Sequence, residues 1–234
     1  LRMMDKAWAE KNKSLEPKDI KTKDENFAHR NANGTGPFML KSWEQDVKLT
    51  LVRNPSWWGK MDGNVTEIVY QPIKAEATRV AALLSGEVDM VLDPSPADLP
   101  RLRSAPNLKV LDGAENRTIF FGMDQFRDEL PGSDVKGKNP LKDVRVRRAL
   151  YQAIDIQTIA RVTMRGLAQP TGALIAPQVN GWTKKADARW PYDMEGAKKL
   201  LAEAGYPQGF EVDFACPNNR YINDEEICQA VASM

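Results

Sequence analysis

One short polar segment combines side chains that could bind an organic acid or a peptide. Asn218, Asn219, Arg220 and Tyr221 follow one another there. An arginine can hold a carboxylate through two parallel hydrogen bonds, an asparagine can pair with amide groups, and a tyrosine offers a flat surface with a polar tip. This composition predicts a ligand-binding loop; the alternative is a solvent-exposed arginine that packs on an aromatic ring.

A second candidate for ligand binding is Asp93, which precedes Pro94 and Ser95 and follows the apolar run at residues 88–92. A loop that follows a strand is positioned by the rigid sheet, while its polar groups remain free. Asp93 could therefore hold a cationic group of a ligand. The alternative is an aspartate that only forms the turn before a proline.

The residue types argue against catalysis. The single histidine, His29, lies in a charged connector, so the sequence supports neither a histidine-based triad nor a multi-histidine metal site. Neither Cys216 nor Cys228 has a catalytic partner near it in sequence. Gly34 and Gly36 lack the third glycine of a phosphate-binding loop and precede a strand. We predict no enzyme activity, no cofactor and no metal ion.

Composition predicts a globular protein without a nucleic-acid partner. Hydrophobic residues make up 42% and charged residues 28%, and 33 Lys and Arg against 32 Asp and Glu leave a net charge of +1. No apolar run reaches the roughly 18 residues of a membrane span, and residues 1–5 lack the pattern of a signal peptide. Cys216 and Cys228 could form a disulfide or remain as two buried thiols.

The first half of the sequence has the pattern of strands with one intervening helix. Strands are expected at residues 38–40, 47–51, 67–73, 88–92, 108–111 and 118–123. The spacing of Val80, Leu83 and Leu84 predicts a helix from residue 76 that ends before Gly86. A helix between two apolar strands is typical of a mixed or parallel α/β sheet.

The second half is expected to be mainly helical. One helix begins after Asp143, a second runs past Ile159 to Gly166, and a third begins after Asp193 and stops at Gly205. A strand is predicted at residues 210–214. A last helix follows with Asn223 or Asp224 as N-cap and reaches residue 234 without a C-terminal cap, so we expect the sequence to be a fragment of a longer protein.

Several separated motifs occur in order over residues 34–215 and together carry a resemblance that none carries alone. They are Gly34-Thr35-Gly36-Pro37-Phe38, Arg53-Asn54-Pro55 with Trp57-Trp58-Gly59, Thr78-Arg79 through Ala82-Leu83-Leu84 to Gly86-Glu87-Val88-Asp89, Val144-Arg145-Val146-Arg147-Arg148-Ala149-Leu150, and Ala204-Gly205-Tyr206-Pro207. The chain resembles the family 5 extracellular solute-binding proteins, the peptide-, opine- and nickel-binding components of ABC importers. We expect most of these motif residues to serve the scaffold.

The resemblance implies a partial α/β fold like that of the two-lobed, type II periplasmic binding proteins, in which two crossing strands join the lobes and ligand is enclosed when they close. On this mapping residues 1–115 belong to a strand-rich first lobe. Residues 116–124 form a hinge crossing strand, and residues 125–234 begin a helix-rich second lobe.

The same mapping adds three candidate site residues in the crossing segment, residues 116–124, and supports Arg220 as a fourth. Phe121, Met123 and Asp124 would pass the back of the cleft, where the first two could form an apolar wall; the alternative is simple burial in a sheet. Arg220 matches a position at which dipeptide-binding relatives carry an arginine beside the ligand.

The function implied by the resemblance is periplasmic capture of a dipeptide, an oligopeptide or a related small solute. The partner would be an ABC permease in the inner membrane, and we expect a monomer. The ligand could also be glutathione, an opine, a sugar oligomer or a metal chelate. Rival functions are a protein-interaction module, favoured by the exposed-looking Trp182 and Trp190, and an α/β enzyme. The aspartate that holds a peptide's amino terminus in the family lies outside this sequence.

Overall fold

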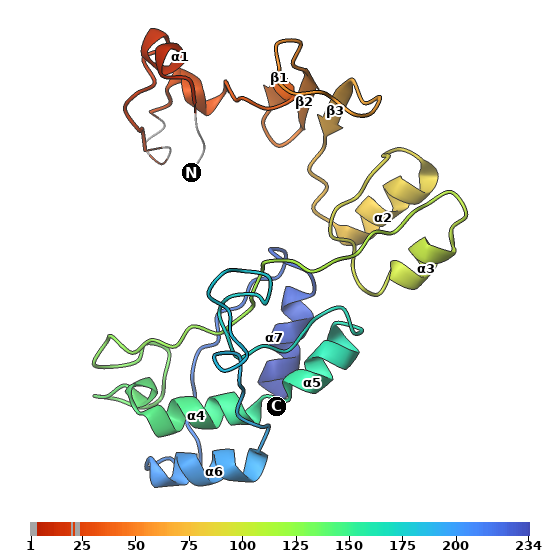
Figure 1. Ribbon diagram of the computed structural model, residues 1–234. Coiled ribbons are helices and arrows are strands. Elements are labelled where there is room, and N and C mark those ends of the chain that lie inside the picture. Colours follow the sequence, from red (N-terminus) through yellow and green to blue (C-terminus); the bar gives the residue numbers. More distant parts are fainter. Residues whose placement is uncertain (1–3, 20, 22–23) are drawn as a thin grey trace. The chain divides into compact units, whose positions relative to one another are not determined.

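A computed structural model describes residues 4–19, 21 and 24–234 (Figure 1). The chain forms two compact units, one ending at Lys74 and the other running from Ala75 to Met234. This division differs in place from the lobe boundary expected at residues 116–124. That boundary stays a prediction, because the compact units are defined by contacts within this chain, whereas the lobes would be defined in a longer protein.

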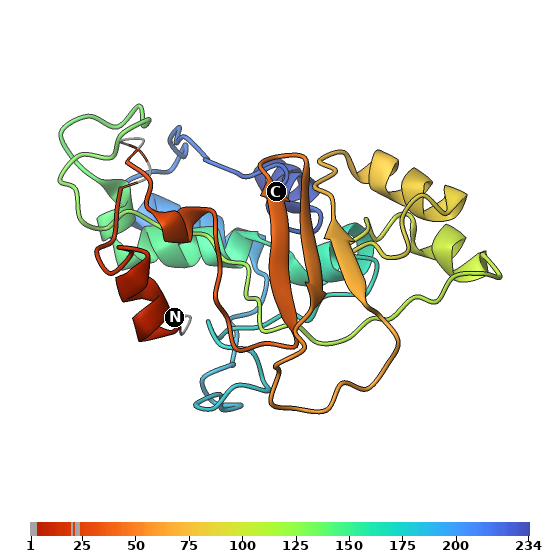
Figure 2. The same cartoon turned by 90° about the horizontal axis from the view of Figure 1, so that it is seen from above.

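The first unit contains an antiparallel sheet of three strands in the order β1-β2-β3, which lie side by side in Figure 2. They are β1 (Phe38–Glu44), β2 (Lys48–Arg53) and β3 (Glu67–Tyr70). Residues 45–47 connect β1 to β2, with Asp46 at φ 60°. The predicted hairpin and third strand are confirmed, although β3 ends three residues earlier than expected.

Two short helices precede this sheet. The helix α1 (Lys6–Lys11) begins after Asp5, whose carboxylate accepts a hydrogen bond from the Trp8 N–H at 2.7 Å. The 3-10 helix η2 (Phe27–His29) follows Asn26, whose N–H donates to Nδ1 of His29 at 2.8 Å. One nitrogen of the single histidine is therefore used to fold a turn.

The second unit begins with α2 (Glu76–Ser85) and α3 (Leu99–Ser104), which share a small apolar cluster. Val80, Leu99 and Leu102 are its buried members. The first helix ends as predicted at Gly86, whose φ of 79° favours glycine. The second was not predicted from the sequence.

A larger cluster lies where α4 (Val144–Ala153) packs along α6 (Met194–Glu203) (Figure 1). Its buried members are Leu130, Val146 and Leu141, the last from η3 (Pro140–Lys142). The side chains of Asp143 and Asp193 accept backbone hydrogen bonds at the starts of α4 and α6. Both predicted N-caps are confirmed.

The remaining helical segments are α5 (Ile156–Thr158), which continues directly into the π-helical η4 (Ile159–Thr163), and α7 (Asp224–Ser233). The last of these contacts η4. The N–H of Gly166 donates to the carbonyl of Ala160, so the predicted end of the second helix is close to the observed one.

Four predicted strands are corrected. Residues 88–92, 108–111 and 118–123 form no strand, and residues 210–214 contribute a single antiparallel bridge between Val212 and Ser133. A strand requires a neighbour that accepts and donates its backbone hydrogen bonds. Within the described residues these segments lack a continuous neighbour, and several of their apolar side chains are exposed, namely Met90, Leu92, Leu111 and Phe120. The sheet that does form is purely antiparallel, so the expected mixed or parallel sheet is absent from the described part of the chain.

Candidate functional site

The four polar residues identified first lie in a loop that is closed by a disulfide. We define the arginine loop as residues 216–223. Cys216 at its start bonds to Cys228 in α7, with the two Cα atoms 6.4 Å apart. Of the two alternatives left open by the sequence, the structure shows the disulfide.

Asp224 fixes the backbone of the arginine loop from inside. Its side chain is buried, with 3% of the residue exposed. Oδ2 accepts hydrogen bonds from the N–H groups of Arg220 at 2.7 Å and Tyr221 at 3.3 Å. Oδ1 accepts from the N–H of Glu225 at 2.9 Å. The carboxylate therefore joins the loop to the first turn of α7, where acidic groups are favourable.

Asn223 provides a second anchor for the same loop. It adopts φ 52°, a left-handed conformation that asparagine tolerates better than most residues. Its side-chain amide donates to the carbonyl of Thr163, at the end of η4, at 2.8 Å. The sequence suggested Asn223 as an N-cap, but its side chain is used here for a contact 60 residues away in sequence.

The backbone of the arginine loop is held by hydrogen bonds, whereas most of its side chains face solvent. Asn218, Asn219 and Arg220 are exposed, and Tyr221 is half-buried. Burial, followed by the neighbouring Asp224 charge, raises the pKa of Tyr221, so its phenol is neutral and able to donate. Among the described residues no carboxylate pairs with the Arg220 guanidinium. The loop thus presents an available cation on a fixed backbone.

The crossing segment lies next to the chain that leads into this loop. The rings of Phe121 and Phe214 meet edge to face, with centroids 5.0 Å apart and an interplanar angle of 62°. Phe214 stands two residues before Cys216. The aromatic contact therefore joins the crossing segment to Phe214, just before the arginine loop.

Met123 and Asp124 are already used by the fold. Met123 packs against the cluster of α4 and α6. The Asp124 carboxylate accepts from the N–H groups of Phe126 and Arg127 and pairs with the Arg127 guanidinium. The Arg127 guanidinium, assisted by these backbone groups, lowers the pKa of Asp124. These contacts favour the structural alternative for both residues.

Asp93 lies in the turn between α2 and α3. It is exposed and has φ 52°. Among the described residues no hydrogen bond or ion pair joins it to the arginine loop or the crossing segment. Its geometry favours the turn-forming alternative.

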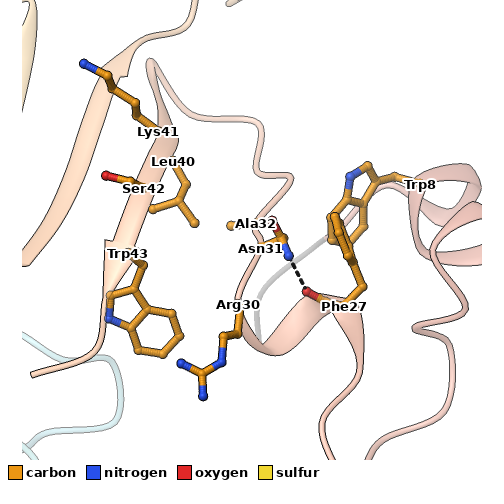
Figure 3. A pocket seen from close by; sticks show the side chains of 9 residues that line it. All are labelled: Trp8, Phe27, Arg30, Asn31, Ala32, Leu40, Lys41, Ser42 and Trp43. Carbon is orange, nitrogen blue, oxygen red and sulfur yellow. Dashed lines mark hydrogen bonds between the residues drawn. The ribbon is translucent and has the colours of Figure 1, made fainter.

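The first unit contains a hollow of about 260 Å³ that the sequence did not reveal. Figure 3 shows Trp43 on one side and Trp8 with Phe27 on the other. The Arg30 guanidinium stands 5.7 Å from the Trp43 ring centroid, but it is bound by Glu25 and Gln45. None of the predicted site residues lines this hollow, and its arginine is not available to a ligand.

A second hollow, of about 360 Å³, lies in the second unit between residues 154–157 and 189–192. Trp190 borders it and stacks edge-on against Tyr151, with centroids 5.4 Å apart. The Arg189 guanidinium covers the Tyr151 ring at 4.6 Å and donates to the Thr171 carbonyl. Trp190 is exposed as expected, whereas Trp182 is half-buried.

Two absences bear on the site. Within residues 4–19, 21 and 24–234, no group of three or more His, Cys, Asp or Glu side chains could hold a metal ion. The described helices run to ten residues at most, well short of the roughly 20 that span a bilayer.

The family model for bacterial extracellular solute-binding proteins, family 5 (middle region), matches residues 4–234. The chain belongs to this family. The resemblance drawn from the motifs is confirmed.

Curated relatives of this family 5 chain are longer than it is. It is 32% identical over 182 residues to heme-binding protein A of Haemophilus influenzae, covering 77% of this chain and 31% of the relative. It is 28% identical over 200 residues to the dipeptide-binding protein of Escherichia coli, covering 82% of this chain and 34% of the relative. The chain thus spans about a third of the length of these relatives.

Solved structures of binding proteins share the fold of this family 5 chain. The periplasmic binding protein DppA of Helicobacter pylori, in complex with the peptide STSA, superposes with a TM-score of 0.76 at 23% identity, over 99% of this chain and 41% of that one. A dipeptide-binding protein from Pseudoalteromonas sp. SM9913, in complex with Met-Leu, gives 0.67 at 24% identity, over 98% and 43%. The predicted fold class, part of a two-lobed periplasmic binding protein, is confirmed.

Proposed function

We propose that this chain is the middle part of a periplasmic solute-capture protein that delivers its ligand to an ABC permease. The family match over residues 4–234 supports the class of activity. The proposal keeps residues 1–115 as part of one lobe, residues 116–124 as a hinge crossing and residues 125–234 as part of the other lobe. Capture of this kind needs no catalytic group.

The solute we propose carries a free carboxylate, and a short peptide fits best. The observation that carries this proposal is the exposed Arg220 guanidinium, which has no carboxylate partner among the described residues, on a backbone fixed by Asp224. An arginine in this state can form two parallel bonds to a carboxylate. Asn218, Asn219 and Tyr221 could bind the amides and side chains of the same ligand.

The crossing segment is proposed to contribute Phe121 as an apolar surface beside the arginine loop. Met123, Asp124 and Asp93 are proposed as secondary contacts, because the fold already uses the first two and the third lies in a turn between α2 and α3.

Heme is a second candidate ligand, because the curated relative at 32% identity is a heme-binding protein. Heme also carries carboxylates, so the same arginine could bind it. The two ligands differ in size and in their need for an apolar surface, and direct titration separates them.

A thermal-shift screen of the full natural chain that contains these residues tests the proposed function. The panel is Met-Leu, Ser-Thr-Ser-Ala, their C-terminal amides, glutathione, an opine, a nickel chelate and heme. A bound ligand stabilises the native state by about 2.7 kcal/mol at a hundredfold excess over Kd. We expect the melting temperature to rise with a free-carboxylate ligand and to rise less with its amide. A flat response to the whole panel would contradict the proposal.

A further inference from the structure

We propose that the Cys216–Cys228 disulfide and the buried Asp224 carboxylate are positioning elements for Arg220, so that solute affinity depends on the oxidised state of this cysteine pair. This inference rests on the proposed function, because it concerns the same loop. It adds regulation to the proposed function: the affinity for the solute would depend on the redox state of the compartment.

The disulfide closes the arginine loop onto the helix that follows it. Cys228 is buried in α7, with 6% of the residue exposed, whereas Cys216 is exposed at the other end of the loop. The bond removes much of the freedom of the 11 residues between the two cysteines. Cys216 and Cys228 are the two cysteines within residues 1–234.

Asp224 alone would hold the loop by only two backbone hydrogen bonds. These come from Arg220 and Tyr221, at 2.7 and 3.3 Å. Both donors lie between the cysteines, so opening the disulfide frees the start of the loop from α7 and leaves it held through the preceding residues, where Phe214 packs on Phe121 and the Asp213 N–H donates to the Gly132 carbonyl. Asn223 anchors the other end through Thr163, next to the helix, and does not restrain Cys216.

The position of the Arg220 backbone matters because, in the part of the chain that the structure describes, no ion pair orients its side chain. A ligand must therefore order the guanidinium when it binds, and a mobile backbone adds to that entropic cost. A fixed backbone lowers this entropic cost, which raises the affinity of ligands that bind the guanidinium. The disulfide should therefore matter for a free carboxylate and little for an amide.

The test compares the wild-type full natural chain with the Cys216→Ser/Cys228→Ser variant by isothermal titration calorimetry. The probes are Met-Leu, Ser-Thr-Ser-Ala and heme, with the two peptide amides as controls. We expect affinity for the bound carboxylate probe to fall about tenfold, and affinity for its amide to change by less than about twofold. A phosphine reductant, which supplies two electrons and converts the disulfide to two thiols, should weaken the wild type and leave the serine variant unchanged.

A double-mutant cycle with Arg220→Ala separates positioning from general stability. If the disulfide acts through Arg220, removing the disulfide from the Arg220→Ala variant should change the affinity for the ligand by less than about twofold. Hydrogen exchange at the amides of Arg220 and Tyr221 should also become faster without the disulfide.

A second variant keeps the test decisive if the serine variant fails to fold. Asp224→Asn retains the disulfide and weakens the acceptor, and we expect an affinity loss of about threefold. Asp193→Asn, which alters the equivalent side chain at the start of α6, is the matched control and should bind like the wild type.

The outcomes distinguish this inference from the proposed function. Equal affinities for wild type and the serine variant, with a carboxylate probe that binds, would overturn the inference and leave the proposed function in place. The same holds if both probe and amide weaken together, since that result indicates general destabilisation. Failure of every probe to bind the wild type would overturn both.

Discussion

Two aspartates in the second unit hold turns in similar ways but leave their arginines in opposite states. Asp124 accepts hydrogen bonds from backbone N–H groups of its turn and also binds the side chain of Arg127. Asp224 accepts backbone N–H groups, including that of Arg220, and within the described residues no side chain donates to it. One arginine is neutralised by its turn, and the other remains available.

Burial explains this difference. Asp224 is 3% exposed and both its oxygens accept backbone N–H groups, from the loop and from Glu225 in α7, whereas the Arg220 side chain is exposed. Asp124 is half-buried and Arg127 is exposed, so the two side chains can meet at the surface. A loop whose buried carboxylate binds the backbone, and not the loop's own arginine side chain, leaves that arginine free to bind a ligand.

The largest expected effect is on stability, from Asp224→Ala. The substitution leaves the N–H groups of Arg220, Tyr221 and Glu225 without their acceptor, so we expect the free energy of unfolding to fall by about 2 to 3 kcal/mol. Urea denaturation at pH 7 measures it. Asp124→Ala is the comparison and should cost less, because its turn is exposed to water and retains the bonds from Asn139. Equal losses in the two variants would remove the distinction.

A smaller effect is the pH dependence that comes from Asp124. Because Arg127 lowers the pKa of Asp124 in the folded state, the ionised form stabilises the fold above the unfolded pKa of about 3.9. This contribution is lost as pH falls through the folded pKa. We expect Asp124→Asn to flatten the acid side of the stability curve below about pH 4. Urea melts at several pH values test this, and an unchanged slope would show that the Arg127 contact is not formed.

Local signals in the sequence predicted their structures well. The turn residues before Phe38 and the alternation that follows it define a hairpin whose partners are neighbours in sequence. Asp143, Asp193 and Gly86 were correctly predicted at helix ends, because capping depends on a few adjacent residues. The family motifs depend on order along the chain, which is also readable from the sequence.

Features that depend on distant partners could not be predicted. The apolar runs at residues 88–92, 108–111 and 118–123 indicated strands, but pairing requires a neighbour that the pattern does not specify. The role of Asp224 was similarly hidden: the sequence suggested a helix cap, whereas one of its oxygens, Oδ2, accepts from the N–H groups of Arg220 and Tyr221 in the preceding loop. Whether Cys216 and Cys228 bond depends on the distance between loop and helix, which their spacing leaves open.

The most direct test of the central claim is the affinity of the full natural chain for Met-Leu, Ser-Thr-Ser-Ala or heme before and after Arg220→Ala. Arg127→Ala serves as the matched control, because its guanidinium is already paired. We predict at least about tenfold weaker binding of the carboxylate ligand for Arg220→Ala, corresponding to about 1.4 kcal/mol, and no change for Arg127→Ala. Unchanged affinity in Arg220→Ala would contradict the account and remove Arg220 from the site.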